Sequence, residues 1–185
     1  YDVDGVTSVT SLYLYLTGLG CDVTCYIPNR LGEGYGMSVA AVDQLAADGV
    51  SLIITVDTGI TAHAEIAHAA SLGVDTVVTD HHECHADIPV CCAVVNPHRP
   101  DCPYPFKELA GVGVVFKLLC AMESLSHPAD KLGECVRRVA MQYGDLVAVG
   151  TIADVMPLVG ENRALVKNGL RYINHRDRVG IAAII

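Results

Sequence analysis

The chain has 185 residues, of which 51% are apolar and 18% are charged, and this balance excludes an intrinsically disordered protein. Trp is absent and Phe occurs twice, so the core must be built from Val, Ile, Leu and Ala. No apolar run reaches the roughly 18 residues that a transmembrane helix requires. Judged by overall charge alone, the formal net charge of −9 argues against a nucleic-acid partner.

Strand and helix patterns alternate over the first hundred residues. Apolar and hydroxyl residues at helical spacing predict a helix at 6–16, and a short strand pattern at 22–27 ends at Pro28. A glycine-rich loop follows. Further helices are expected at 37–47 and 62–71, and buried strands are expected at 51–56, 74–78 and 93–95. This order is typical of βαβ units and predicts an α/β fold with a parallel sheet flanked by helices.

The second half of the chain is expected to be mainly helical. Four prolines over 97–105 indicate a connection across the surface. Helices are predicted at 109–124, 130–142 and 163–174, and a buried apolar segment at 147–152. We therefore expect a single domain over 1–185, with a sheet core at roughly 1–100 and a helical part at 105–185 that completes the site.

Both ends of the chain resemble interior sequence. Tyr1 leads directly into Asp2-Val3-Asp4-Gly5, which would follow a strand further upstream, and the apolar run at 180–185 has no cap or turn signal after it. We therefore expect a piece of a longer protein that is truncated at both ends. No targeting segment is visible, although a truncated N-terminus would not contain one.

The eight cysteines follow no CxxC pattern, and this favours a reduced, cytoplasmic protein. Cys21, Cys25, Cys120 and Cys135 lie in apolar stretches and are predicted to be buried thiols. The other four share the stretch 81–102 with histidines, which leaves open whether this stretch binds an extra metal ion.

Acidic residues follow several of the predicted apolar segments. They are Asp57 after 52–56, Asp80-His81-His82 after 76–79, Asp154 after the run ending in Ile152-Ala153, and Asp2 and Asp4 at the start of the chain. A single Asp in such a place often caps a helix or turn. Several carboxylates at one sheet edge repel each other unless cations hold them. Oxygen and imidazole ligands suit Mn²⁺ or Mg²⁺ more than Zn²⁺, and two such ions would clamp an attacking hydroxide and a phosphate.

At these positions the chain resembles a known family. Tyr1-Asp2-Val3-Asp4-Gly5, Val56-Asp57-Thr58-Gly59-Ile60 and Thr79-Asp80-His81-His82-Glu83 are similar to motifs of the DHH phosphoesterase superfamily. Further motifs resemble its RecJ-type, single-strand-specific 5′→3′ exonucleases. They are Pro28-Asn29-Arg30, Glu33-Gly34-Tyr35-Gly36, Asn96-Pro97, Leu109-Ala110-Gly111-Val112-Gly113, Ala153-Asp154-Val155-Met156-Pro157-Leu158 and Glu161-Asn162-Arg163. This ordered set extends over nearly the whole chain.

The resemblance implies a phosphodiesterase site that uses two divalent ions, Mn²⁺ or Mg²⁺. The implied metal ligands are Asp2, Asp4, Asp57, His81 and Asp154, with Asp57 bridging the ions. His82 would contact the scissile phosphate and act as an acid, while Asp80 would orient a neighbouring imidazole. The family's first motif begins a few residues before Tyr1, so one metal position can be incomplete here. Cys84 is expected to be a bystander.

Substrate contacts are expected on a loop and on a helix. Arg30 and Tyr35 share the glycine-rich loop, where Arg can pair with a phosphate and Tyr can stack on a base. An ordinary solvated loop is the alternative on residue types alone. Arg163 is a further candidate phosphate contact. The Gly111-Val112-Gly113 segment is expected to permit close helix packing near the site.

The sequence thus predicts a metal-dependent exonuclease that degrades single-stranded DNA 5′→3′ to 5′-mononucleotides in repair and recombination. The implied partners are single-stranded DNA, a single-strand-binding protein and a helicase, with no membrane. One alternative is a related phosphoesterase acting on short oligonucleotides, nucleotide phosphates or pyrophosphate. Another is a non-catalytic replication scaffold. The isolated chain is expected to be weakly active or inactive, because a second domain that grips the strand would lie beyond it.

Overall fold

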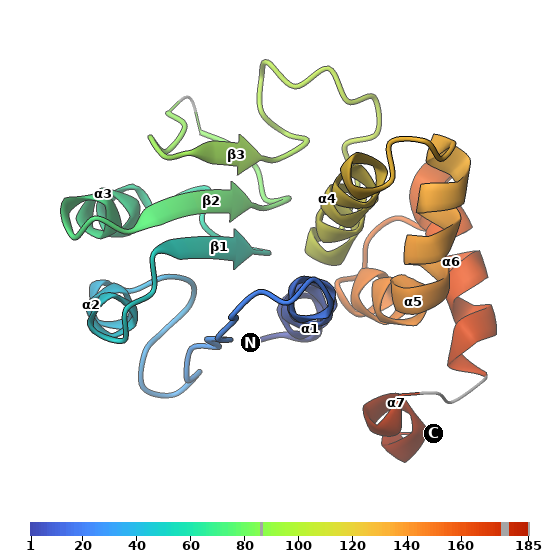
Figure 1. The fold of residues 1–185 in the computed structure, drawn as a ribbon, viewed down its shortest axis with the longest axis horizontal. Coiled ribbons are helices and arrows are strands. Elements are labelled where there is room, and N and C mark those ends of the chain that lie inside the picture. The colour runs from blue at the N-terminus through green and yellow to red at the C-terminus, as the bar shows by residue number, and fades with distance from the viewer. Residues whose placement is uncertain (86, 175–177, 185) are drawn as a thin grey trace.

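The computed structural model describes residues 1–85, 87–174 and 178–184, and its sheet is parallel, as predicted (Figure 1). The sheet contains β1 (Leu52–Val56), β2 (Asp75–Thr79) and β3 (Ala93–Val95) in the order β1-β2-β3. The register pairs Val56 with Thr79 and Thr79 with Val95. All three strands therefore present their carboxyl ends at the same edge.

Seven helices are formed by the described residues. They are α1 (Val3–Gly18), α2 (Val39–Ala47), α3 (His63–Ser71), α4 (Gly111–Ser126), α5 (Leu132–Ala153), α6 (Gly160–Ile173) and α7 (Val179–Ile184). α2 and α3 lie alongside the sheet, while α1 packs against α4 and α5 of the predicted helical part, which also contains α6 and α7 (Figure 1). None of the described helices is long and apolar enough to cross a bilayer.

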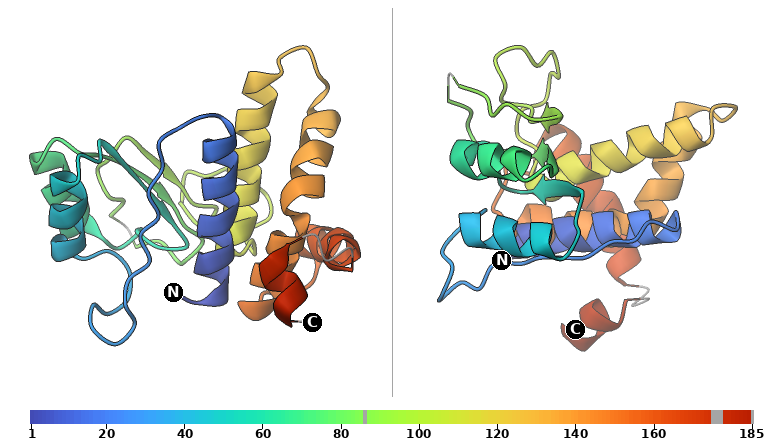
Figure 2. Two further views of the ribbon diagram at one scale, coloured as in Figure 1. Left: turned by 60° about the horizontal axis from the view of Figure 1, so that its bottom comes forward. Right: turned by 60° about the vertical axis from the view of Figure 1, so that its left-hand side comes forward.

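Two apolar clusters fill the interior. The smaller joins Val42 of α2 and Ala69 of α3 to Val74 and Ile53. The larger lies between α1, α4 and α5, which stand side by side in the left view of Figure 2. Ile54 packs against this larger cluster, so consecutive residues of β1 serve opposite faces, as strand geometry requires. The core is mainly aliphatic, as the composition predicted.

The strand expected at 22–27 is not formed. Residues 22–27 pair with none of β1, β2 and β3, and together with β1, α1 and α2 they line a cavity of about 550 Å³. Cys21 and Cys25 are exposed, contrary to the prediction that they are buried thiols. Cys120 and Cys135 are buried, as predicted.

The predicted segments at 130–142 and 147–152 belong to one helix of 22 residues, α5. Gly144 within it allows a close crossing with α6. A Cβ added at Gly144 would lie 3.1 Å from Tyr172, and one added at Gly169 of α6 would lie 2.0 Å from the Gly144 carbonyl oxygen. The two glycines let the backbones touch, and the packing on α6 offsets the low helix propensity of Gly144.

This crossing predicts opposite effects for two glycine substitutions. Gly169→Ala should lower the free energy of unfolding by about 1–3 kcal/mol, because the new methyl group overlaps the backbone of α5. Gly133→Ala in the first turn of α5 meets no atom within 4 Å. It should be neutral or stabilise the chain by up to about 1 kcal/mol. Urea denaturation of both variants checks this, and equal midpoints would contradict the close crossing.

Candidate metal centre

Four elements bring acidic and imidazole side chains to the carboxyl edge of the sheet. Asp57 follows β1 directly, and Asp80-His81-His82 follows β2. Asp4 lies in the first turn of α1, and Asp154 is the C-cap of α5. The arrowheads of the strands point toward α1 and α4 in Figure 1, so the side chains meet where the sheet borders the helices.

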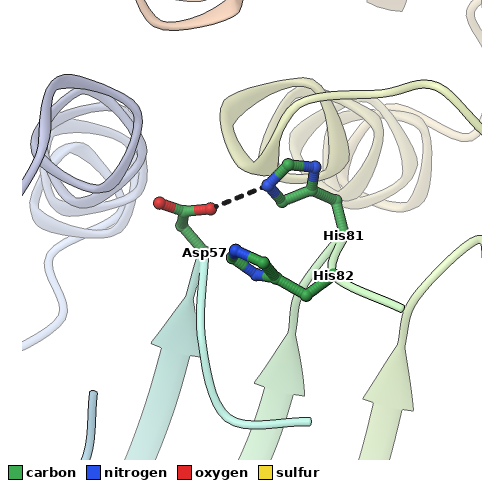
Figure 3. Close-up of side chains that lie close together, drawn as sticks. All are labelled: Asp57, His81 and His82. Carbon is green, nitrogen blue, oxygen red and sulfur yellow. Dashed lines mark ion pairs between the residues drawn. The ribbon is translucent and has the colours of Figure 1, made fainter. Parts of the chain in front are cut away.

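His81 stands at the centre of this group. Its Nε2 atom lies 3.1 Å from Asp57 Oδ1, 3.6 Å from Asp154 Oδ2 and 3.8 Å from Asp4 Oδ2. Figure 3 shows the Asp57 carboxylate directed at this nitrogen, with His82 beside it. Asp4, Asp57 and His81 are buried. Apart from their contact with each other, neither His81 Nε2 nor Asp57 Oδ1 has a hydrogen-bond partner among the described residues.

The ligand atoms form two overlapping groups. One contains Asp57, His81 and His82, and the other contains Asp4, His81 and Asp154. Within each group the atoms lie within 4.8 Å of one another, which is close enough for a single metal ion. In the described parts of the chain, no such group includes a cysteine of the stretch 81–102.

Burial and mutual repulsion make these carboxylates hard to ionise together. Burial, followed by the charge of Asp57, raises the pKa of Asp4 to about 7. Burial also raises the pKa of Asp57 and that of Asp154. Burial alone would lower the pKa of His81, but the carboxylates of Asp57 and Asp4 raise it overall. The centre is therefore stabilised when it binds either protons or metal cations.

Asp4 is held by the start of α4. Its two oxygens accept hydrogen bonds from the backbone N–H groups of Gly111, at 2.6 Å, and Val112, at 2.8 Å. These N–H groups have no hydrogen-bond acceptor within their own helix, and the carboxylate provides one for each. A Cβ at Gly111 would lie 2.7 Å from Asp57 Oδ1, which fits the close packing predicted for this segment. Gly150 of α5 is equally confined, because its Cβ would lie 3.0 Å from Asp4 Oδ1.

A tight turn orients Asp57. Its φ of 58° lies in the left-handed region, which Asp and Asn tolerate better than most residues. The Thr55 hydroxyl donates to the carbonyl of Thr58 at 2.7 Å. Gly59 follows with a φ of 111°, and a Cβ there would lie 2.5 Å from Thr55 Oγ1. Side-chain and backbone constraints thus both direct the carboxylate away from the strand and toward His81.

Asp80 and His82 form a second pair beside the centre. Asp80 Oδ1 accepts from the backbone N–H groups of His81 and His82 and lies 2.7 Å from His82 Nδ1, while Oδ2 accepts from Ile60 N. Burial would raise the pKa of Asp80, but these donors, His82 first, lower it overall. The bond to Asp80 raises the pKa of His82 to about 9, so this imidazole is protonated at neutral pH.

Asp2 lies apart from both ligand groups. It is exposed, and its Oδ1 caps α1 by accepting from Gly5 N at 2.8 Å. The cap position is one of the two roles that the sequence left open for these acids. Asp2 still lies near enough to Asp57 to raise the pKa of that carboxyl.

The glycine-rich loop approaches the centre through its aromatic residue. The rings of Tyr35 and His82 meet edge to face, 6.4 Å apart. Tyr1 lies 5.6 Å from Tyr35, and the Arg30 guanidinium lies 5.1 Å from the Tyr1 ring. Tyr1 is not among the predicted site residues, because its contacts with Tyr35 and Arg30 form only when this loop folds back. Arg163 lies exposed in the first turn of α6, and its side chain forms no hydrogen bond or ion pair with the described residues.

This geometry and the fold agree with a class of phosphoesterase domains. The family model described as "DHH family, N-terminal domain" matches residues 1–151, so the chain belongs to the DHH family. Within that family it is similar to the single-stranded-DNA-specific exonuclease RecJ of Salmonella typhimurium, at 44% identity over 100% of this chain and 33% of that protein. The RecJ of Bacillus subtilis is 45% identical over 100% of this chain and 22% of that protein.

Solved structures show the same similarity. A crystal structure of exonuclease RecJ bound to manganese matches 98% of this chain and 44% of that one, with a TM-score of 0.83 and 41% identity. RecJ of Thermus thermophilus in complex with Mg²⁺ matches with a TM-score of 0.60 and 32% identity, over 99% of this chain and 21% of that one. The predicted resemblance is confirmed along the whole chain, which spans a third or less of the two curated relatives named above.

The raised pKa of Asp4 predicts how the stability of the metal-free chain depends on pH. The folded form holds this proton more tightly than the unfolded form, so the contribution of Asp4 to stability falls as pH rises from about 4 to about 7. Asp4→Asn removes this titration and should gain stability relative to the wild type over that range. Urea midpoints between pH 4.5 and 7.5 with a chelator check this. Parallel curves for the two proteins would contradict it.

Proposed function

We propose that the chain is the catalytic domain of a metal-dependent exonuclease that degrades single-stranded DNA 5′→3′ to 5′-mononucleotides in repair and recombination. The observation that carries the proposal is the gathering of the Asp4, Asp57 and Asp154 carboxylates around His81 Nε2 at the carboxyl edge of the sheet. Its second support is the similarity to RecJ exonucleases along the whole chain.

The residues present fit divalent metal ions. Asp57 Oδ1 and His81 Nε2 are buried polar atoms that face each other and have no other partner among the described residues, and a cation between them would satisfy both. Carboxylate and imidazole donors together suit Mn²⁺ or Mg²⁺, the ions named in the two RecJ structures. We infer two ions, held by Asp4, Asp57, His81 and Asp154, with Asp57 as the bridge and Asp2 as a further ligand. When bound, such ions supply a hydroxide nucleophile near neutral pH and neutralise charge on the phosphate.

The residues around the ions have roles that follow from their surroundings. His82 is held protonated by Asp80, and in the proposed mechanism it contacts the scissile phosphate and donates its proton to the leaving oxygen. Asp80 positions the imidazole of His82. Arg30 and Arg163 would pair with phosphates, and Tyr35, beside His82, would stack on a base.

The wider context is proposed on the same basis. The sheet part at roughly 1–100 and the helical part at 105–185 form one catalytic domain, and a second domain that grips the strand lies beyond it. We place the protein in the cytoplasm, with a single-strand-binding protein and a helicase as partners. The net charge of −9 is compatible with a DNA substrate, because the proposed contacts are local metals and a few arginines.

Asp57→Ala in the full-length protein tests this function. It should reduce Mn²⁺-dependent digestion of end-labelled single-stranded DNA by more than about 100-fold, since losing even an outer partner of a metal ligand costs 10–100-fold. Asp43→Ala, which removes an exposed carboxylate of α2, is the matched control and should leave the rate unchanged. Full activity of Asp57→Ala would refute the mechanism. Preference for substrates of a few nucleotides, or no Mn²⁺ binding at all, would favour a short-substrate phosphoesterase or a scaffold.

The pH–rate profile tests the role of His82. A general acid must be protonated, so activity should fall at alkaline pH in the wild type, once the pH exceeds the raised pKa of His82. Asp80→Asn weakens the bond that raises this pKa. The alkaline limb of the profile should therefore move toward the ordinary value for histidine, about 6.5. An alkaline limb that stays in place in Asp80→Asn would exclude His82 as the acid.

A further inference from the structure

A buried amide lies behind the metal centre. Asn162, in the first turn of α6, is completely buried. Its Nδ2 atom donates to the carbonyl oxygen of Glu108 at 2.5 Å and to that of Pro157 at 3.1 Å. These carbonyl groups lie 49 positions apart in the sequence, in two separate loops. One side chain therefore ties the two loops together.

The first loop leads into α4 and the ligand Asp4. Glu108 lies three residues before Gly111, and the intervening Leu109 and Ala110 are buried. Gly111 donates to Asp4 Oδ2 and leaves no room for a side chain beside Asp57. A shift of the Glu108 carbonyl group would therefore move the start of α4 and, with it, the carboxylates of Asp4 and Asp57.

The second loop carries Asp154. Pro157 lies three residues after it, and Val155 between them has a φ of 57°, a region that β-branched residues rarely adopt. The Asp154 side chain is 28% exposed, more than Asp4 or Asp57, and it accepts no hydrogen bond from any described residue. Its position relative to His81 therefore depends on the conformation of this loop.

The orientation of the amide shows which end of the side chain matters. Only the NH₂ end can donate to two carbonyl oxygens, so Oδ1 points elsewhere and is buried without a hydrogen-bond partner among the described residues. An apolar side chain of similar size would avoid the unpartnered Oδ1, but it would leave the carbonyl groups of Glu108 and Pro157 without this donor. The two N–H donors are therefore what this position contributes.

We propose that Asn162 is a positioning residue of the metal centre, which fixes the distance between Asp154 and the Asp4–Asp57 side of the site. This inference rests on the proposed metal binding by these acids. In that arrangement Asn162 touches neither metal nor substrate. It acts through the Glu108 and Pro157 carbonyl groups on the two loops that hold the ligands.

The test compares Asn162 with Asn168, an exposed residue of the same helix, in the full-length protein. Asn162→Asp has the same shape but lacks both donors, whereas Asn162→Ser keeps one hydroxyl donor. Asn168→Asp is the control for charge and helix. For each protein, calorimetry gives the Mn²⁺ dissociation constant at a temperature where the protein is folded, and thermal unfolding with a chelator gives its stability.

Asn162→Asp should weaken Mn²⁺ binding by about 10–100-fold, as is usual when a partner of a metal ligand is lost. Asn162→Ser should fall between it and the wild type, and Asn168→Asp should bind like the wild type. Wild-type affinity in Asn162→Asp would overturn the proposal, and if that variant does not fold, wild-type affinity in Asn162→Ser would do so. Failure of the wild type to bind Mn²⁺ would refute the proposed function itself, which is a different result.

Discussion

The hydrogen bonds between the Asp4 carboxylate and the first N–H groups of α4 join the first helix of the chain to the fourth. Asp4 belongs to α1, which packs against α4 and α5 and also contacts β1. The same bonds bring Gly111 against Asp57 at the end of β1. The site thus exists only where the sheet edge, α1, α4 and the end of α5 meet, and its proposed ligands come from four segments that extend from Asp4 to Asp154.

Electrostatics explains why this junction needs a cation. The fold places Asp4 and Asp57 in a buried position with His81 between them, and burial raises the pKa of both carboxyl groups. Protonation relieves the repulsion between the two carboxylates but removes their negative charge. Divalent ions relieve the repulsion while both carboxylates stay ionised.

Much of this centre could be predicted from the sequence, because the acids directly follow apolar segments whose strand character is local. The sheet order and the gathering of Asp57 and His81 follow from parallel βαβ topology. Other features depend on distant partners. The segment 22–27 has strand composition but no neighbour to pair with, α5 continues through Gly144 because α6 packs there, and Asn162 gains its role only from two loops.

The left-handed backbone at Asp57 limits which residues can replace it without strain. Aspartate, asparagine and glycine accept such a conformation, and most other side chains strain it. The codons of asparagine and glycine each differ from an aspartate codon by one base. Substitutions that abolish the carboxylate can thus arise in one step and keep the turn. A folded but inactive relative is therefore an accessible neighbour of this sequence, and an intact fold alone does not identify an active member of the family.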